Sequence, residues 1–424
     1  MLAAPRRKLL TVLTAPAAVV ALLAGAQLAV GRTADSPATA STASHAQAPQ
    51  DRRVAAWSPS MTAGGPNFND QTIRMVAHST VDGDALRIHL SNLRGTIPLS
   101  VAHVTIGAQA DRATAVARSL LPVTFDHRRS VTVPTGGEVV SDPVAMHVKA
   151  DQSVLISIYL PHATSSATWH SDAFDTSYLS TPGDHTTETS DASYVAARTS
   201  WYYLSGIDVV PTHARGTVVA FGDSITDGYN TPAGAYRRWP DDLARRLAAT
   251  SPMGVVDAGI GGNRVLTDVP NIWQGVSAGK RFAHDALGQP GVRDVILLEG
   301  INDIGNNAGP GGAPLTAQDL IDGYRDLIRQ AHAAGVRIIG GTMLPDKGNG
   351  YYSDSAEAIR QAANQWIRTS GAFDGVVDFA KAAADPADPA ALNPAYDSGD
   401  HIHPNEAGMQ ALADAVDLSL LTGT

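Results

Sequence analysis

The chain has 424 residues, of which 44% are hydrophobic and 17% charged, and its formal net charge is −10, as expected for a soluble globular protein of two or three domains. Nucleic acid is excluded as a partner, because phosphate binding requires a basic face and no basic run occurs beyond the first ten residues. The absence of cysteine excludes disulfides, thiolate metal sites and a cysteine nucleophile.

The first fifty residues have the pattern of a targeting segment and a spacer. Three cationic residues at 6–8 precede an apolar stretch that ends at Val30, and a Ser/Thr/Ala/Pro tract follows. This order predicts a secretory signal peptide over residues 1–31 and a disordered spacer over residues 32–50. We therefore expect a secreted, extracellular protein. A retained membrane anchor is the alternative, since the apolar stretch is about long enough to span a bilayer.

Residues 51–210 have the patterns of short β-strands. Apolar and polar residues alternate from Leu86 to Leu90, which is the two-residue period of a half-buried strand. The same period occurs at residues 131–133, before a Pro-Thr-Gly-Gly turn, and residues 154–160 form an apolar run typical of a buried strand. Short strands separated by Gly and Pro predict an antiparallel β-sandwich, here an accessory domain.

The same segment is rich in aromatic residues: Trp57, Phe68, Trp169, Tyr178, Trp201, Tyr202 and Tyr203. Exposed aromatic rings stack on sugars, which would make the segment a carbohydrate-binding module. We favour the other interpretation, in which these rings pack in the sandwich core or in the seam with the next domain.

Residues 211–424 alternate between strand and helix patterns. Short apolar strands are predicted at 217–221, 254–260, 292–298, 336–344 and 375–379. Helical patterns are predicted between and after them, at 237–249, 316–334, 355–370 and 405–420. This order predicts an α/β domain with a parallel sheet covered by helices on both faces. Ligands of such sheets bind beyond the carboxyl ends of the strands.

Distinctive fragments follow the first two of these strands. Ser224 follows the first, where its hydroxyl can be exposed at the sheet edge, although a helix N-cap or a turn is the alternative. Gly261 and Gly262 follow the second, and their backbone amides can turn toward an anion. A phosphate cradle would need a Lys-Ser/Thr pair or a dinucleotide fingerprint, and neither is present.

Two further fragments complete the set. Asn302 follows the third strand, where its side-chain amide can point toward the same anion unless it only forms an Asx turn. Asp400 precedes His403 by three residues, so its carboxylate can orient one imidazole nitrogen while the other faces a nucleophile. A metal site that includes His401 is the competitor, but side chains two apart in an extended chain point to opposite sides, and we predict no metal ligands.

These fragments resemble the motifs of the SGNH hydrolases, also called GDSL esterases and lipases. The resemblance covers residues 215–424, about half of the chain, with Ile225 where a leucine-like residue is usual. The four matching fragments occur in the family's order: Gly222-Asp223-Ser224, Gly262, Gly300-Ile301-Asn302-Asp303, and Asp400 with His403-Pro404. The resemblance implies a three-layer flavodoxin-like fold and ester hydrolysis without a metal or organic cofactor. The β-rich segment is similar to amino-terminal domains of exported bacterial members.

The resulting hypothesis is a secreted serine esterase with Ser224 as nucleophile, His403 as base and Asp400 as the orienting acid. The backbone amides of Ser224 and Gly262, with the Asn302 side chain, are its expected oxyanion hole. The substrate would be an ester of a small molecule, a carbohydrate or a lipid, with short-acyl or carbohydrate esters favoured over a lipase or phospholipase activity. No obligate protein partner is indicated. A non-catalytic carbohydrate-binding surface protein is the hypothesis from a different class.

Overall fold

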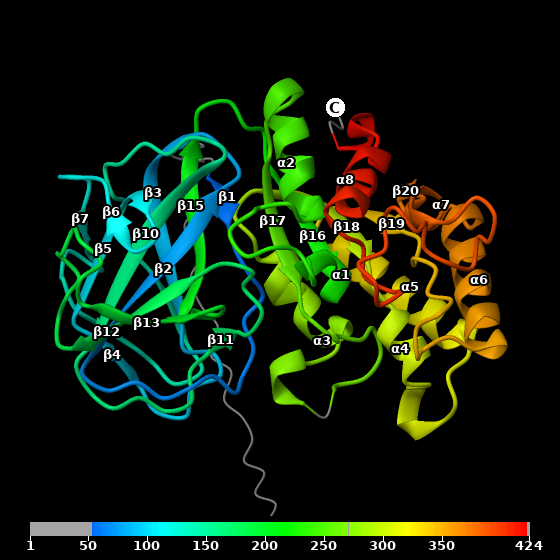
Figure 1. Ribbon diagram of the computed structural model, residues 1–424, viewed down its shortest axis with the longest axis horizontal. Helices are drawn as coiled ribbons and strands as arrows, with labels where there is room; N and C mark the ends of the chain where they lie inside the picture. Colours follow the sequence, from blue (N-terminus) through cyan, green and yellow to red (C-terminus); the bar gives the residue numbers. More distant parts are fainter. Residues whose placement is uncertain (1–52, 270, 422–424) are drawn as a thin grey trace, which may run out of the picture. The chain divides into compact units, whose positions relative to one another are not determined.

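The computed structural model describes residues 53–269 and 271–421, with a β-rich part up to Pro211 and an α/β part from Thr217 (Figure 1). The predicted signal peptide and spacer lie outside the described residues. Within the two described ranges, every helix is too short or too polar to cross a bilayer.

Two antiparallel sheets form the β-rich part. One has the order β1 (Val54–Trp57), β15 (Leu204–Pro211), β3 (Gly83–Ser91), β9 (Glu138–Val140). The other has the order β13 (Tyr194–Arg198), β12 (Ser177–Pro182), β2 (Gln71–Ser79), β10 (Gln152–Leu160), β5 (His103–Asp111), β6 (Thr114–Ala115), and β7 (Leu121–Val123) also pairs with β5. Two short ribbons pair β4 (Leu99–Val101) with β8 (Val131–Val133) and β11 (Trp169–His170) with β14 (Trp201–Tyr202).

Side chains from both sheets meet in one apolar core, which confirms the predicted sandwich. Ile88 and Leu90 of β3 point into it together with Ile73 and Met75 of β2, as the alternating pattern requires. Six of the seven aromatic residues singled out in the sequence are buried, and Trp169 is half-buried. The packing interpretation of these rings is therefore confirmed, and they do not form an exposed sugar platform.

The α/β part is built on five parallel strands. Their order is β17 (Gly254–Gly259), β16 (Thr217–Gly222), β18 (Val292–Leu298), β19 (Arg337–Gly341), β20 (Gly375–Val377). In chain order this is 2-1-3-4-5, the flavodoxin-like arrangement, so the order reverses at β16. A crevice for ligands is expected beyond the carboxyl end of β16, where Ser224 lies.

Helices cover both faces of this sheet, as predicted. Phe221 and the strand residues on the same face of the sheet pack on α3 (Ala278–Phe282), α5 (Ala317–Ala333) and α6 (Asp354–Thr369). Ala220 and the strand residues on the opposite face pack on α2 (Trp239–Thr250), α7 (Phe379–Ala383) and α8 (Glu406–Ala415). Short helices follow the ends of β16 and β18, namely α1 (Ser224–Asp227) and α4 (Ile301–Gly305). Others lie in the connections: η1 (Ile272–Gln274), η2 (Ala283–Leu287) and η3 (Pro310–Gly312).

Two predicted elements are too long by more than two residues. The last helix ends at Ala415, and the Asp417 side chain accepts a hydrogen bond from the Ser419 N–H to begin a separate turn, η4 (Leu418–Leu420). The fourth strand ends at Gly341 rather than at residue 344. There the Met343 N–H donates to the Asn364 side-chain oxygen, and the Asn364 side-chain N–H donates to the Met343 carbonyl, each at 2.8 Å. The Asn364 side chain thus replaces the hydrogen bonds of a neighbouring strand.

The two parts meet along a seam that follows β1. The Ala55 N–H donates to Thr217 Oγ1 and to the Pro290 carbonyl, each at 3.0 Å. A Cβ atom at Gly254 would lie 2.1 Å from the Ala55 carbonyl oxygen, so only glycine permits this approach. The parallel sheet is thus held directly against the first strand of the sandwich.

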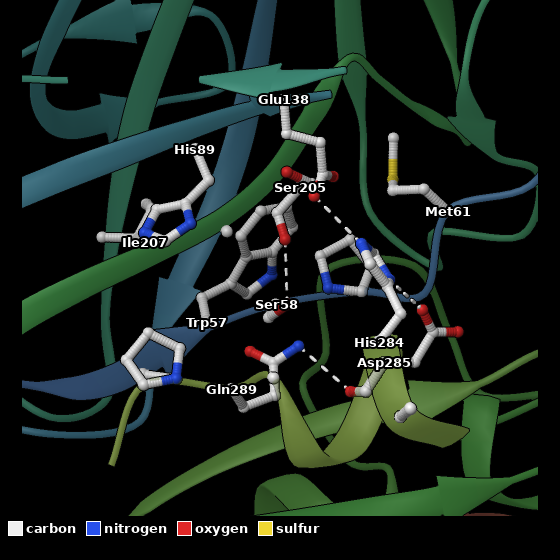
Figure 2. A pocket seen from close by; sticks show the side chains of 16 residues that line it. Trp57, Ser58, Met61, His89, Glu138, Ser205, Ile207, His284, Asp285 and Gln289 are labelled. Atoms are coloured by element: carbon white, nitrogen blue, oxygen red, sulfur yellow. Dashed lines mark hydrogen bonds and ion pairs between the residues drawn. The ribbon is translucent and has the colours of Figure 1, made fainter. Parts of the chain in front are cut away.

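A cavity of about 300 Å³ lies in this seam (Figure 2). Trp57 and Glu138 line it from the β-rich part and His284 from η2. His284 bonds the carboxylates of Asp285 (2.6 Å) and Glu138 (2.9 Å), which raise the pKa of His284 to about 10. None of the site residues predicted from the sequence lines this cavity.

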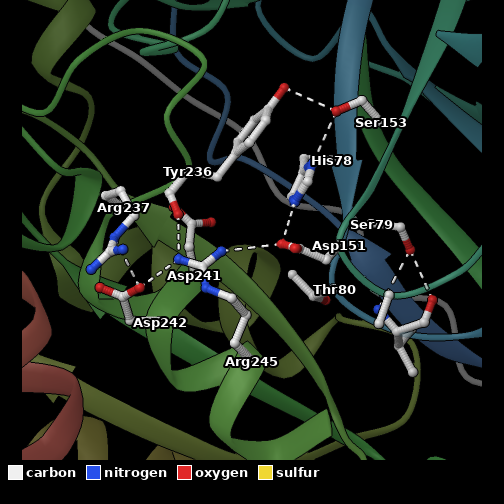
Figure 3. Close-up of polar contacts among 12 residues, drawn as sticks. His78, Ser79, Thr80, Asp151, Ser153, Tyr236, Arg237, Asp241, Asp242 and Arg245 are labelled. Atoms are coloured by element: carbon white, nitrogen blue, oxygen red, sulfur yellow. Dashed lines mark hydrogen bonds and ion pairs between the residues drawn. The ribbon is translucent and has the colours of Figure 1, made fainter. Parts of the chain in front are cut away.

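A polar network fastens α2 to the sandwich at another point of the seam (Figure 3). The His78 ring stacks on Tyr236 with centroids 3.7 Å apart, and its nitrogens bond Ser153 (2.9 Å) and Asp151 (3.0 Å). Arg245 of α2 also donates to Asp151, at 3.1 Å. The two parts are therefore joined at this point by polar contacts and a ring stack.

Candidate active site

Ser224 stands at the junction of β16 and α1. Asp223 is the N-cap of α1, and its carboxylate accepts the Ile225 N–H at 3.0 Å. The alternative role of Ser224 as a helix cap is therefore wrong. Because Asp223 satisfies the helix end, the Ser224 hydroxyl is available for another partner.

That partner is His403, which lies 179 positions away in the chain. Ser224 Oγ is 2.9 Å from His403 Nε2, and His403 Nδ1 is 2.6 Å from Asp400 Oδ2. Burial by itself would raise the pKa of Asp400, but hydrogen bonds from the backbone N–H and the ring of His403 lower it to about 2. Asp400 is therefore a carboxylate at any pH near neutrality.

His401 takes no part in this arrangement. Its Nδ1 bonds Asp397 Oδ2 at 2.6 Å, and its side chain is exposed. The backbone of His401 is in the left-handed region, with a φ of 65°. The two histidines thus bond different carboxylates, His401 that of Asp397 and His403 that of Asp400.

The residues expected to bind an oxyanion lie on the loops after β17 and β18. Gly262 has a φ of 75°, a left-handed conformation that favours glycine. Asn302, buried at the start of α4, donates one side-chain N–H to the Asn263 carbonyl at 3.0 Å. That contact ties α4 to the glycine loop, and the amide of Asn302 has a second N–H.

The sequence analysis missed Arg281, which is buried beneath the site. Its guanidinium donates to oxygens of the strand ends, the glycine loop and the sandwich: Gly222 O (2.8 Å), Ala258 O (2.8 Å), Asn263 Oδ1 (2.8 Å) and Ser60 Oγ (3.1 Å). It also faces the carboxylates of Asp285 and Glu299, each at 3.4 Å. A single arginine in a short helix gives no sequence pattern that would reveal these contacts.

Three further features of the site are the buried acids Asp223, Asp303 and Glu299, whose pKa values are raised. Burial raises the pKa of Asp223 to about 7 and of Asp303 to about 7, although both accept backbone N–H bonds. Burial likewise raises the pKa of Glu299 to about 8, because desolvation outweighs the attraction of Arg281. These acids contrast with Asp400, which is half-buried and ionised.

The rim of the site carries exposed aromatic side chains that the sequence analysis also missed. Tyr229, 43% exposed, has its ring centroid 4.6 Å from that of His403. Trp273, 36% exposed, and Asp172 of the β-rich part both lie next to Gly261: a Cβ there would be 3.7 Å from the indole and 3.4 Å from the carboxylate. The rim therefore combines aromatic surface with a hydrogen-bond acceptor.

A serine bonded to a histidine beyond the switch point of a parallel α/β sheet is the arrangement of a serine hydrolase. The sequence matches the GDSL-like lipase/acylhydrolase family over residues 220–411, and this domain belongs to that family. Residues 220–411 thus form an SGNH-type serine hydrolase domain that acts on ester bonds. A search of curated proteins finds no match.

Solved structures resemble the α/β part over about half of this chain. A GDSL-like lipase from Bacteroides thetaiotaomicron is 20% identical, with 50% of this chain and 90% of that chain covered and a TM-score of 0.38. An aryl esterase from M. smegmatis is 16% identical, with 49% and 99% covered and a TM-score of 0.39. An acetylxylan esterase from Geobacillus stearothermophilus is 21% identical, with 50% and 96% covered and a TM-score of 0.37.

The buried acids predict that the melting temperature falls as the pH rises. A carboxyl group whose pKa is raised on folding keeps its proton in the folded chain and loses it in the unfolded chain above about pH 4, so its favourable contribution is lost as the pH rises through about 7 to 8. We expect a fall of about 5 °C or more between about pH 5 and pH 9. Glu299→Gln should make this slope shallower, as calorimetry at several pH values will measure. An equal slope in the variant, or a melting temperature that rises with pH, would contradict the assignment.

Proposed function

We propose that the protein is an exported carboxylic ester hydrolase with Ser224 as nucleophile, His403 as general base and Asp400 as the carboxylate that orients the base. The backbone amides of Ser224 and Gly262 and the side-chain amide of Asn302 form its oxyanion hole. One observation carries the proposal: the chain of contacts from Ser224 Oγ to His403 Nε2 (2.9 Å) and from His403 Nδ1 to Asp400 (2.6 Å). Each of its distances is within hydrogen-bond reach before any substrate binds.

The protonation of this chain of contacts follows from its partners. Asp400 is ionised and can only accept, so the proton of neutral His403 resides on Nδ1 and Nε2 carries the lone pair. Nε2 then accepts the Ser224 proton as the hydroxyl oxygen attacks the ester carbonyl carbon. The imidazolium gives this proton to the departing alcohol oxygen, which leaves an acyl group on Ser224.

Deacylation repeats the sequence with water. His403 removes a proton from a water molecule, whose oxygen attacks the acyl carbon, and the Ser224 oxygen leaves with the proton held by the imidazolium. The net products are a carboxylic acid and an alcohol. In both halves negative charge develops on the former carbonyl oxygen, and the N–H groups of the oxyanion hole are stronger partners for that charge than for the neutral ester.

The rim supports short-acyl esters of carbohydrates as the substrate class. Trp273 and Tyr229 offer exposed ring faces on which a sugar can stack, and the Asp172 carboxylate can accept its hydroxyl groups. These groups flank Gly261 and His403, so a ring bound there brings an ester on one of its hydroxyls near Ser224. The Ser171 hydroxyl donates to Asp172 Oδ2 at 3.0 Å, which holds this carboxylate beside the rim.

Replacement of the nucleophile or of the side-chain oxyanion donor should abolish turnover without unfolding the protein. We expect Ser224→Ala to hydrolyse p-nitrophenyl acetate at background rate, and Asn302→Ala to lose about 100- to 1000-fold in kcat. Stopped and continuous assays of p-nitrophenol release will measure the turnover of each variant, and melting curves will show that each variant is folded. Ser355→Ala, at an exposed serine of α6, is the matched control and should keep full activity. Ester hydrolysis that survives in Ser224→Ala would refute the mechanism.

The substrate class is tested by comparing esters that differ in the acyl chain and in the alcohol. Acetylated oligosaccharides and p-nitrophenyl acetate should be hydrolysed, and p-nitrophenyl palmitate should not. Trp273→Ala should raise KM for the oligosaccharide by about tenfold, the equivalent of about 1.4 kcal/mol, and leave p-nitrophenyl acetate nearly unaffected. Ile97→Ala, which removes an exposed apolar side chain of the sandwich, is the control. Preference for the long acyl chain would indicate a lipase instead.

Export is tested by the fate of the first residues. Expression in a host with a general secretory pathway should release into the medium a chain that lacks residues 1–31, as mass spectrometry will report. Replacement of the three cationic residues at 6–8 by glutamine should retain the chain inside the cell, because the positive start is part of the signal. Recovery of the full-length chain in the membrane fraction would support the anchor alternative.

A further inference from the structure

We propose that His170 of the β-rich part is a positioning residue for the oxyanion loop, so the sandwich takes part in ester hydrolysis. This inference rests on the proposed function, in which the Gly262 amide stabilises the oxyanion. His170 belongs to the two-residue strand β11 (Figure 1), and nothing in its sequence context marks it as functional.

The contacts of His170 reach from the sandwich to the nucleophile helix. Its Nδ1 lies 2.8 Å from the Ser60 carbonyl oxygen, and its Nε2 lies 3.0 Å from Asp227 Oδ1. Asp227 is the last residue of α1, which begins with Ser224. Both side chains of the pair are buried, with 4% and 3% of their surface exposed.

Asp227 bonds the glycine loop as well as His170. Its second carboxylate oxygen accepts the Gly261 N–H at 3.1 Å, and Gly261 immediately precedes the proposed oxyanion donor Gly262. The loop is held tightly at this point, since a Cβ at Gly259 would lie 2.3 Å from the Asp227 nitrogen. One carboxylate thus fixes the peptide next to the Gly262 amide.

The partners of His170 determine its charge. A carbonyl oxygen and a carboxylate oxygen both accept, so both ring nitrogens must donate and the ring is an imidazolium. Burial lowers the pKa of His170, but the charges of Asp227 and Asp172 and the two hydrogen bonds raise it to about 9. The buried carboxylate of Asp227 is thereby neutralised by a cation that comes from the other part of the chain.

The sandwich core fixes the position of this cation. The Trp201 ring packs against His170 with centroids 5.5 Å apart, and the preceding Trp169 donates its indole N–H to the Ala63 carbonyl at 2.8 Å. Ser60 is held in turn by its hydroxyl contact with Arg281, at 3.1 Å. His170 therefore has no freedom to follow Asp227 if the loop moves.

The expected consequence of losing His170 is specific to the transition state. Without the cation Asp227 can turn toward water, and the Gly261–Gly262 peptide loses its fixed direction. A donor misplaced by about 1 Å costs about 100-fold in rate, and the cost falls on kcat because the oxyanion exists only during the reaction. Substrate binding at the rim does not use this donor, so KM should stay nearly constant.

Two substitutions separate the nitrogens of His170 in the full-length chain. The amide nitrogen of His170→Gln can reach the position of Nε2 and donate to Asp227, whereas that of His170→Asn reaches only the position of Nδ1. We expect kcat for p-nitrophenyl acetate to fall about 30- to 100-fold in His170→Asn and to recover most of this loss in His170→Gln. KM should change by less than about twofold in both.

A second measurement reports the oxyanion hole directly. Phenylboronic acid adds to a serine nucleophile as a charged tetrahedral adduct, so its inhibition constant should weaken in His170→Asn by a factor similar to the loss in kcat. His78→Asn is the matched control: it removes a buried seam histidine that contacts Tyr236, Ser153 and Asp151 and is not bonded to the glycine loop (Figure 3). It should lower the melting temperature and leave kcat and boronate affinity unchanged.

The outcomes are distinguishable. The inference is overturned if His170→Asn keeps its kcat, or if kcat falls while boronate affinity does not, provided that Ser224→Ala and Asn302→Ala are inactive. Activity in those two variants would instead refute the proposed function. If His170→Asn does not fold, Asp227→Ala and Asp227→Asn ask the same question, because asparagine can still accept the Gly261 N–H and alanine cannot. Equal kcat in these two variants would also overturn the inference.

Discussion

The buried guanidinium of Arg281 holds the site together. Leaving a cation of this kind without partners costs several kcal/mol, so its surroundings must supply acceptors. The carbonyls of Gly222 and Ala258 do so at the ends of β16 and β17, where ladder pairing stops. The guanidinium also lies over the Phe221 ring, 3.8 Å from its centroid, which adds a cation–π contact from the core. Strand ends that would otherwise be free to move are therefore fixed by one charge.

The acids of the site are of two kinds. Asp223 and Glu299 are buried near Arg281 and Asp303 near Arg264, but desolvation outweighs the attraction of these cations, so burial favours the protonated forms of all three acids near neutral pH. Asp400 lies at the rim and receives hydrogen bonds from His403, which favour its ionised form. Protonated acids beneath the nucleophile avoid placing several negative charges near a carbonyl oxygen that must itself become negative. The environment of each carboxyl group, and not its residue type, decides its role.

The sequence predicted what depends on local pattern. Apolar runs and helical periods located the five parallel strands and the main helices, and most element bounds agree to within two residues. The errors occur where a side chain replaces a backbone partner, as Asn364 does at the end of β19. Ser224, Asp400 and His403 could be singled out because residues that follow parallel strands gather at one edge.

Two of the missed residues, Arg281 and His170, form contacts across long distances in the chain. Arg281 bonds Ser60, 221 positions away, and His170 bonds Asp227 from a two-residue strand of the other part. No periodicity or motif records such contacts, since each depends on how the two parts pack. Trp273 and Tyr229 lie in irregular or very short elements, where exposure cannot be inferred from the pattern of neighbours.

The family match over residues 220–411 includes neither Ser60 nor His170, yet both are partners of charges buried under the site. Without the sandwich, Arg281 would lose one acceptor, and Asp227 would lose the one ion-pair partner that lies within 4 Å of it among the described residues. Water can replace a hydroxyl at little cost, but it replaces a buried counter-charge poorly. The placement of the glycine loop therefore depends on a residue that the sandwich supplies, His170, through its contact with Asp227. In a chain without disulfides, the seam itself provides this fixed geometry.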